Sequence, residues 1–519
     1  MLSAETGHIP GADDDDCTAP ILCSREGCTQ VATPGELEHD WSGWTITIDA
    51  TATTAGSRTR DCLRMNCDVT QTESIPATGG GTPQPPGGGY TPPPPPSGGG
   101  GGTTTPPADT TVNVIVDGKP VDAGTVSVSG NTTTVTVNQD VINQQIANAT
   151  DNVTVVVPSD IGTATARLVV QNVDDMAERA LTLTVQVGDV RYDIPTTAID
   201  TAAIMSILGA TNTANVPLNI TITNLSTTPS FVQNAANSSG FELVLPPIQF
   251  NITATYDGKT VMISKFSEFV SRTVEITAVQ AQKITTAVVV NPDGTVRQVP
   301  TRVYQSGGKW YAEINSLTNS TYALIFNERR FSDAAGKWYE AAVNEMGSRM
   351  IIGGIGGDLF AGERDMTCAE FSAIIIKALG LPAIGNGTIF SDVSAGAWYN
   401  GAVAQAYEYG LVTGNNGRFD PERKITRQEA MVLIHRASRL AGLSGSGAQP
   451  PESPGDLLSV FSDADSVSDW ALESIKWNVR TGLVTGSDGK LNPLDNISRA
   501  EVAALTLKLL RRAGLVDVR

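Results

Sequence analysis

The sequence contains very little histidine. Its 519 residues include only His8, His39 and His435, so residues 40–434 contain none. A Ser-His-Asp or Cys-His catalytic arrangement requires a histidine beside its nucleophile. Paired carboxylates that hydrolyse glycosides are not excluded by counting, but aromatic residues make up only 6% of the chain and could line few sugar clefts. We therefore expect that the chain is not an enzyme and holds no cofactor.

Basic residues are in the minority. The chain has 35 Lys plus Arg against 54 Asp plus Glu, which gives a formal net charge of −19. A protein that binds nucleic acid needs a basic face, so we expect no nucleic-acid partner. An anionic ligand would have to be bound by local geometry, because the overall field repels it.

Long apolar runs are also missing. No stretch of eighteen apolar residues occurs, whereas about twenty are needed to span a bilayer, so we expect no transmembrane segment. Residues 1–5 do not begin a basic and apolar export signal, and we expect an exported form to continue upstream of them.

Cysteine is scarce and concentrated near the N-terminus. Residues 1–78 hold Cys17, Cys23, Cys28, Cys62 and Cys67, and the sixth cysteine is Cys368. The pairs Cys23–Cys28 and Cys62–Cys67 share one spacing, which fits two disulfides or a four-thiolate zinc site. Small secreted modules favour disulfides, and the usual zinc knuckle has two intervening residues instead of four. We predict a small Cys-rich module that holds disulfides, with zinc as the alternative, and no metal site elsewhere in the chain.

The next two segments differ sharply in composition. Residues 79–108 are rich in Gly and Pro, which predicts a disordered linker. Residues 109–328 alternate apolar and polar side chains, as in Leu181, Leu183 and Val185, and Asp257-Gly258 and Asp293-Gly294 are typical of hairpin turns. This pattern predicts a β-rich, sandwich-like region of one or two domains, in which residues 198–208 are the best helix candidate.

The last third of the chain repeats one pattern three times. Each unit opens with Phe-Ser-Asp, has a Trp seven to nine residues after the Phe, and continues through a helix-like segment into a Gly-rich turn. Self-similarity at this period predicts a structural repeat. The matched positions are Asp333, Asp392 and Asp463, then Trp338, Trp398 and Trp470, and then the turn glycines Gly414 and Gly486.

After each turn, a hydroxyl residue is followed three positions later by glutamate and by an apolar run. This spacing predicts a capping box, in which the hydroxyl and the carboxylate each accept a backbone N–H at the start of a helix. The pairs are Thr367 with Glu370, Thr426 with Glu429, and Ser498 with Glu501.

Arginine follows the capping hydroxyl in the last two units, as Arg427 and Arg499. A cation in the first turn of a helix interacts unfavourably with the macrodipole. Because the arginine nevertheless occurs in two repeats, we expect it to have a functional role. A solvated surface arginine is the simpler interpretation, and an anion-binding arginine is the sharper one.

These motifs resemble the S-layer homology family over roughly the last 190 residues. The resemblance implies an all-α, pseudo-threefold bundle of three units, at residues 329–388, 389–445 and 460–519, with a linker at 446–459. It also implies grooves between neighbouring units that bind pyruvylated secondary cell-wall polysaccharide through the matched Asp, Trp, Gly and Arg residues. The first unit departs from the pattern, because Cys368 replaces the arginine and Ala361-Gly362 replaces the Asp-Pro or Asn-Pro turn. These departures leave open whether the first repeat has a working groove.

The resemblance also implies a location and a function. We expect an extracellular protein at the bacterial cell wall, anchored non-covalently by residues 331–519, that displays its upstream modules and could associate laterally in a surface layer. The alternative is that the chain is the anchored fragment of a larger wall hydrolase or adhesin.

Overall fold

A computed structural model describes residues 45–48, 56–61, 70–75, 113–158, 162–384, 389–443 and 457–518 of the chain. The chain divides into two compact units, Met1–Thr104 and Thr105–Arg519, and each is described by itself. Cys17, Cys23, Cys28, Cys62 and Cys67, and with them the disulfide and zinc interpretations, lie outside the described residues. The two segments predicted to be linkers, apart from residues 457–459, lie outside them too.

The described part of the first unit is a small antiparallel sheet. Its strands are β1 (Thr45–Ile48), β2 (Gly56–Asp61) and β3 (Thr70–Ile75), in the order β1-β2-β3. Thr59 of β2 pairs with Thr45 of β1 and with Thr72 of β3.

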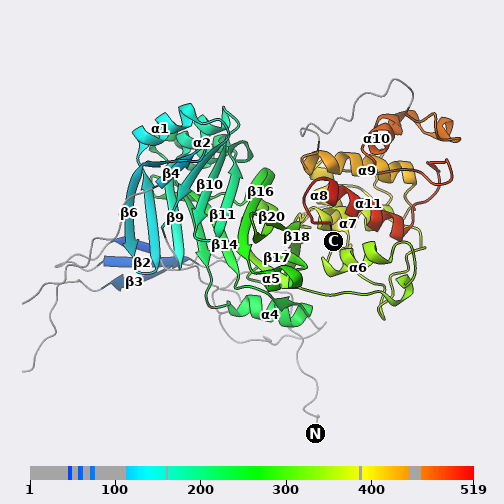
Figure 1. Ribbon diagram of the computed structural model, residues 1–519, viewed down its shortest axis with the longest axis horizontal. Helices are drawn as coiled ribbons and strands as arrows, with labels where there is room; N and C mark the ends of the chain where they lie inside the picture. The colour runs from blue at the N-terminus through cyan, green and yellow to red at the C-terminus, as the bar shows by residue number, and fades with distance from the viewer. Residues whose placement is uncertain are drawn as a thin grey trace, which may run out of the picture. The chain divides into compact units, whose positions relative to one another are not determined.

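The second unit begins with two mixed β-sheets, which confirms the predicted β-rich region (Figure 1). The first sheet has the order β19-β20-β16-β11-β10-β8-β4-β5, with strands β4 (Asn113–Val116), β5 (Lys119–Asp122), β8 (Asn152–Val156), β10 (Thr182–Val187), β11 (Val190–Pro195), β16 (Lys265–Ile276), β19 (Thr301–Ser306) and β20 (Lys309–Thr318). The second has the order β18-β17-β21-β14-β12-β9-β7-β6, with strands β6 (Gly124–Ser129), β7 (Thr132–Val137), β9 (Thr163–Val169), β12 (Pro217–Asn224), β14 (Ile248–Tyr256), β17 (Thr286–Val290), β18 (Val296–Val299) and β21 (Thr321–Phe326); β13 (Glu242–Leu243) and β15 (Lys259–Met262) pair at its side.

The two sheets enclose one hydrophobic core, to which Val185 and Tyr192 contribute from the first sheet and Ile220 and Phe250 from the second. Each strand in this core presents its apolar side chains inward at every second position. The alternation is clear in β14, where Ile248, Phe250, Ile252 and Ala254 are buried and the residues between them are only partly so.

Five α-helices accompany the sheets: α1 (Gln139–Asn148), α2 (Val170–Ala177), α3 (Thr201–Leu208), α4 (Ser230–Ser239) and α5 (Ala278–Lys283). Figure 1 shows α1 and α2 at one end of the sheets, where each connects a strand of the second sheet to a strand of the first. The helix expected at residues 198–208 starts at Thr201, because the Asp200 side chain accepts the Ala203 N–H and caps it there. The turns Asp257-Gly258 and Asp293-Gly294 join β14 to β15 and β17 to β18.

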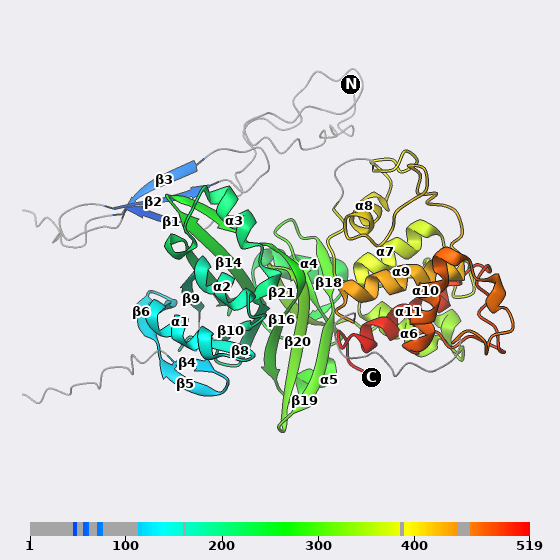
Figure 2. The same ribbon diagram turned by 90° about the horizontal axis from the view of Figure 1, so that it is seen from above.

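The C-terminal region is helical, as expected, with two α-helices in each repeat. They are α6 (Glu340–Ser348) and α7 (Cys368–Ala378), α8 (Asn400–Glu408) and α9 (Arg427–Leu440), and α10 (Asp469–Arg480) and α11 (Arg499–Arg512). Figures 1 and 2 show α11 lying beside both α7 and α9, and all three helices share one hydrophobic core. Within the described ranges, no helix is both long and apolar enough to cross a membrane.

The three repeats close on one another through their backbones. Met366 N–H donates to Ile497 O at 3.0 Å, Ile497 N–H to Ile425 O at 3.1 Å, and Ile425 N–H to Met366 O at 3.1 Å. Each of these residues immediately precedes a capping hydroxyl. The closed cycle therefore holds the starts of α7, α9 and α11 together.

The β-region is joined to the first repeat by further hydrogen bonds. Gln298 in β18 donates to the Lys377 and Ala378 carbonyls, which lie at the C-terminus of α7. Arg349, at the end of α6, is 1% exposed. It donates to Thr301 O at 2.9 Å and forms ion pairs with Glu345 and Asp517.

Candidate functional site

The aspartate that opens each repeat fixes the Gly-rich turn. Asp333 accepts the N–H groups of Phe360 at 2.8 Å and Ala361 at 2.7 Å. Asp392 does the same for Phe419 and Asp420, and Asp463 for Leu491 and Asn492, at 2.7–2.8 Å. Burial raises the pKa of each carboxyl, but the two N–H donors outweigh it and hold the pKa below its ordinary value. These carboxylates thus act by positioning the turn.

The turn glycines are required by close packing. Gly414 has φ +66°, and a Cβ there would lie 2.3 Å from the Phe390 ring and 2.7 Å from Arg418 O. Gly486 has φ +69° and meets Phe461 and Lys490 O in the same way. Glycine therefore lets the turn lie against the phenylalanine that opens its own repeat.

The three helices α7, α9 and α11 begin with capping boxes. Thr367, Thr426 and Ser498 accept the N–H groups of Glu370, Glu429 and Glu501, and each glutamate accepts the N–H of its hydroxyl residue. The boxes leave the residue after the hydroxyl free to point away from the helix.

Arg499 occupies that position in α11 and reaches the turn of the first repeat. Its Nε donates to Phe360 O at 3.0 Å and its Nη2 to Gly353 O at 3.1 Å, while Nη1 lies 3.8 Å from Glu370. The guanidinium also stacks 4.7 Å from the Phe360 ring. A guanidinium has five N–H groups, so three of them remain for other partners.

Arg427 makes the equivalent contacts between the second and third repeats. Its Nε donates to Leu491 O at 2.9 Å, and its Nη1 pairs with Glu501. Each arginine therefore donates to carbonyl oxygens in the turn of another repeat. These bonds offset the unfavourable interaction of the arginine with the macrodipole of its own helix. Arg499 is 7% exposed, so the interpretation as a solvated surface charge is wrong for it.

Because each helix start contacts the turn of another repeat, Cys368 of the first repeat affects the second groove and not the first. The sequence leaves open whether the first repeat's groove works, and the structure places Arg499 of the third repeat in the lining of that groove. Cys368 lies instead against the turn of the second repeat, where its N–H donates to Arg423 O at 3.0 Å. Burial raises the pKa of its thiol to about 11, so it is uncharged at neutral pH. The physical reason is the closed backbone cycle, which pairs each helix start with a neighbouring turn.

A cavity of about 260 Å³ lies at the first turn, and we call it the first groove. It brings together Arg499 and Trp398, two residues that the sequence singles out. Its other lining residues include Gly353, Gly354, Arg364, Glu370 and Lys377. Glu370 pairs with Arg364 and faces Arg499, which leaves this groove with more positive than negative charge.

A cavity of about 220 Å³ lies at the second turn, and we call it the second groove. It brings together Cys368, Gly414 and Trp470. Its basic residues are engaged within their own repeat. Arg423 binds Glu429 with two hydrogen bonds of 2.7 and 3.0 Å, Arg418 pairs with Asp420, and Arg436 donates to Leu411 O.

The three repeat tryptophans are exposed. The exposed fractions are 66% for Trp338, 69% for Trp398 and 59% for Trp470. Trp338 and Trp398 each rest edge-on against the following tyrosine, and these tyrosines, not the tryptophans, pack against the core. An exposed indole beside an arginine can take the apolar face of a sugar while the guanidinium binds its anionic substituent.

The capping motifs do not identify two sets of basic residues that line the grooves. Arg364 and Arg423 stand three residues before the capping hydroxyl, and Lys377 and Arg436 stand ten residues after it. Each pair recurs at a fixed offset in the first two repeats. Alignment of the repeats for basic residues, rather than for apolar ones, is the signal that finds them.

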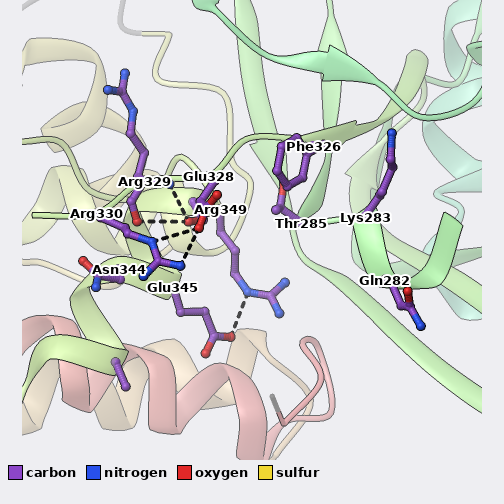
Figure 3. A pocket seen from close by; sticks show the side chains of 12 residues that line it. Gln282, Lys283, Thr285, Phe326, Glu328, Arg329, Arg330, Asn344, Glu345 and Arg349 are labelled. Atoms are coloured by element: carbon purple, nitrogen blue, oxygen red, sulfur yellow. Dashed lines mark hydrogen bonds and ion pairs between the residues drawn. The ribbon is translucent and has the colours of Figure 1, made fainter. Parts of the chain in front are cut away.

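A larger cavity, of about 410 Å³, lies between α5 and α6 (Figure 3). Its charged groups largely neutralise one another. Arg349 pairs with Glu345, Arg330 with Glu328, and Lys283 with Glu242. This cavity is therefore a poor candidate for an anion site, although it is larger than either groove.

Comparison with known proteins shows what the repeats are similar to. The family model described as the S-layer homology domain matches residues 389–431 and 460–503, which lie in the second and third repeats. The chain is 30% identical over 214 residues to an amylopullulanase of Thermoanaerobacterium thermosulfurigenes, which covers 40% of this chain and 11% of that protein. It is 33% identical over 180 residues to the surface-layer 125 kDa protein of Lysinibacillus sphaericus, which covers 34% and 14%.

A third relative, the S-layer protein sap of Bacillus anthracis, is 23% identical over 180 residues, or 35% of this chain and 21% of the relative. The chain thus spans between about a tenth and a fifth of the length of these three relatives.

Proposed function

Because this chain carries S-layer homology domains and is a protein of the cell surface, we propose that its three repeats anchor it to a pyruvylated secondary cell-wall polysaccharide. The anchoring is non-covalent, and the grooves are related by a pseudo-threefold axis through the backbone cycle. The observation that carries the proposal is the first groove, where the buried Arg499 lies with the exposed Trp398.

The chemistry of this groove suits a pyruvyl ketal. The ketal carries a carboxylate on a sugar ring, so one side is anionic and the other apolar. Arg499 is held in place by Phe360 O and Gly353 O, and a guanidinium fixed in this way binds a carboxylate without a large loss of side-chain entropy. Burial and the neighbouring Arg364 lower the pKa of Arg499, while Glu370 and Asp333 oppose them; an arginine remains charged at neutral pH.

The test is sedimentation of the full chain with purified wall sacculi. We expect binding to intact sacculi, and loss of binding after the wall polysaccharide is removed while peptidoglycan is kept. Selective removal of the pyruvyl ketal should also abolish binding. Equal binding to bare peptidoglycan would refute the proposal.

A second candidate function is that the chain is the anchoring part of a larger wall hydrolase or adhesin. One relative is named as an amylopullulanase, and this chain matches 11% of its length. A muralytic assay run beside the sedimentation test separates the two. Hydrolysis of purified walls by the protein isolated in its native form from the cell surface would favour the hydrolase, whereas binding by that form without hydrolysis favours an anchor.

A further inference from the structure

A second hollow adjoins the first groove. It has a volume of about 390 Å³ and lies between the first turn, the segment that follows β21, and the end of α4. Ile352, Gly353, Gly354 and Lys377 line both this hollow and the first groove. The two cavities therefore adjoin along one stretch of turn, and a chain-like ligand could pass from one to the other.

Two basic side chains line the hollow without a bonding partner among the described residues. Arg329 and Lys377 are both exposed, and among the described residues no hydrogen bond or ion pair is found for either side chain. Asp358 is the one carboxylate in the lining. Figure 3 shows Arg329 directed away from the paired charges of the neighbouring cavity. Arg329 therefore differs from Arg330 beside it, which pairs with Glu328.

Gly353 lines both cavities. Its φ lies outside the left-handed region, and a Cβ built there would meet no atom within 4 Å. Neither backbone strain nor packing within the described chain therefore requires glycine at this position. The matching residues of the other two repeats are Thr413 and Thr485.

The hollow lies where the β-region meets the first repeat. Ser239 of α4 and Asn327 after β21 form part of its wall. Asn327 Nδ2 donates to Ser348 O at 2.9 Å, and Arg329 N–H donates to Ser348 Oγ at 2.9 Å. These two bonds attach the backbone at Asn327 and Arg329 to Ser348 of α6. The segment that leaves the β-region therefore forms one wall of the hollow beside the first groove.

We propose that this hollow is a second subsite for the wall polymer, in which Arg329 and Lys377 bind an anionic group on the residue next to the sugar held in the first groove. The inference rests on the proposed function. The anionic group is an oxyanion, either a carboxylate of the sugar or a phosphate. A subsite of this kind makes the affinity depend on the length of the polymer fragment, because a single repeating unit fills the first groove alone.

The experiment is calorimetric titration of the full chain with wall polymer released from sacculi and separated into single repeating units and longer fragments. Arg329→Gln should weaken binding of the longer fragments on the order of tenfold, since a charge-assisted hydrogen bond is lost, and leave single units unaffected. Gly353→Thr, which installs the residue of the other repeats, should reduce the preference for longer fragments. Arg330→Gln is the matched control and should change neither.

Two treatments of the polymer identify the anion. Dephosphorylation, or use of fragments whose sole carboxylate is the ketal held in the first groove, should abolish the effect of Arg329→Gln, according to which group is bound. The inference is overturned if Arg329→Gln binds longer fragments like the wild type, or if its effect survives both treatments. If the wild-type protein binds no fragment of either length, the proposed function fails and the subsite fails with it.

Discussion

The first and second grooves have the same plan and differ at the residue that follows a capping hydroxyl. In the first groove, Arg499 reaches across from the third repeat, whereas Cys368 occupies the corresponding position in the second. Both grooves keep an exposed tryptophan, Trp398 or Trp470, and a capping-box glutamate. The comparison shows that each groove is assembled from neighbouring repeats, so that a substitution in one repeat acts on the groove of the next.

The difference changes how the basic groups of each groove are used. In the second groove, Arg423 binds Glu429 with both of its terminal nitrogens. In the first, Glu370 pairs with Arg364 and also faces Arg499, so positive charge is left over. We infer that the first groove binds an anion and that the second does so weakly.

The largest expected effect comes from Arg499→Ala, which removes the residue that distinguishes the first groove. The guanidinium is buried and bonded to two carbonyl oxygens and near Glu370, so its loss should lower the free energy of unfolding by about 3 kcal/mol. Binding of the pyruvylated fragment should fall about a hundredfold. Thermal melts and calorimetry measure the two effects, and Arg512→Ala, an exposed arginine of the same helix, serves as the control. A variant as stable as the wild type would mean that Arg499 is not fixed by these contacts.

Trp398→Ala and Trp470→Ala sharpen the comparison without a cost in stability. Both indoles are more than half exposed, and surface substitutions usually change the free energy of unfolding by no more than about 0.5 kcal/mol. We expect Trp398→Ala to weaken fragment binding about tenfold and Trp470→Ala to leave it nearly unchanged, as measured by calorimetry. Equal losses in the two variants would show that the second groove binds as well as the first.

Cys368→Arg should repair the second groove. The start of α9 and the start of α11 both accept arginine at this position, so the variant should fold. We expect an additional binding site in the calorimetric stoichiometry and a severalfold gain in affinity for sacculi. Cys368→Ser is the matched control without a charge. An unchanged stoichiometry would indicate that Arg423 and Glu429 already close this groove.

The smallest effect concerns the pH dependence of the turns. The pKa values of Asp333, Asp392 and Asp463 are lower in the folded protein than in the unfolded chain, so these groups stabilise the fold above the unfolded pKa. That contribution is lost as the pH falls below about 4 and through the folded pKa. Asp333→Asn should cost about 1 kcal/mol at pH 7 through one lost hydrogen bond, and melts should show the difference shrinking in acid. A constant difference between pH 7 and pH 3 would contradict this role.

Local features of the repeats could be predicted from the sequence. The capping boxes follow from Thr or Ser followed three residues later by Glu, a spacing that is set within one helical turn. The β-rich region follows from its alternating pattern, and the hairpin turns follow from Asp-Gly pairs. These signals are local in sequence, so they need no knowledge of how the repeats assemble.

The assembly of the grooves could not be predicted in the same way. That Arg499 serves the first turn depends on contacts with Gly353 and Phe360, which lie more than a hundred residues away in the chain. Asp333 recurs in the other two repeats, which suggests a ligand-binding carboxylate, but both of its oxygens accept N–H groups of the turn backbone. Arg329 has no basic counterpart in the other two repeats, where the matching residues are Thr388 and Ser459.

The most direct test of the account is a crystal structure of the full chain with a pyruvylated repeating unit of the wall polysaccharide. We predict electron density for the ketal carboxylate beside Arg499, with the sugar ring against Trp398, and no ligand density beside Cys368 and Trp470. Density at Cys368 with an empty first groove would contradict the central claim that the arginine supplied by the third repeat makes the first groove the stronger binding site.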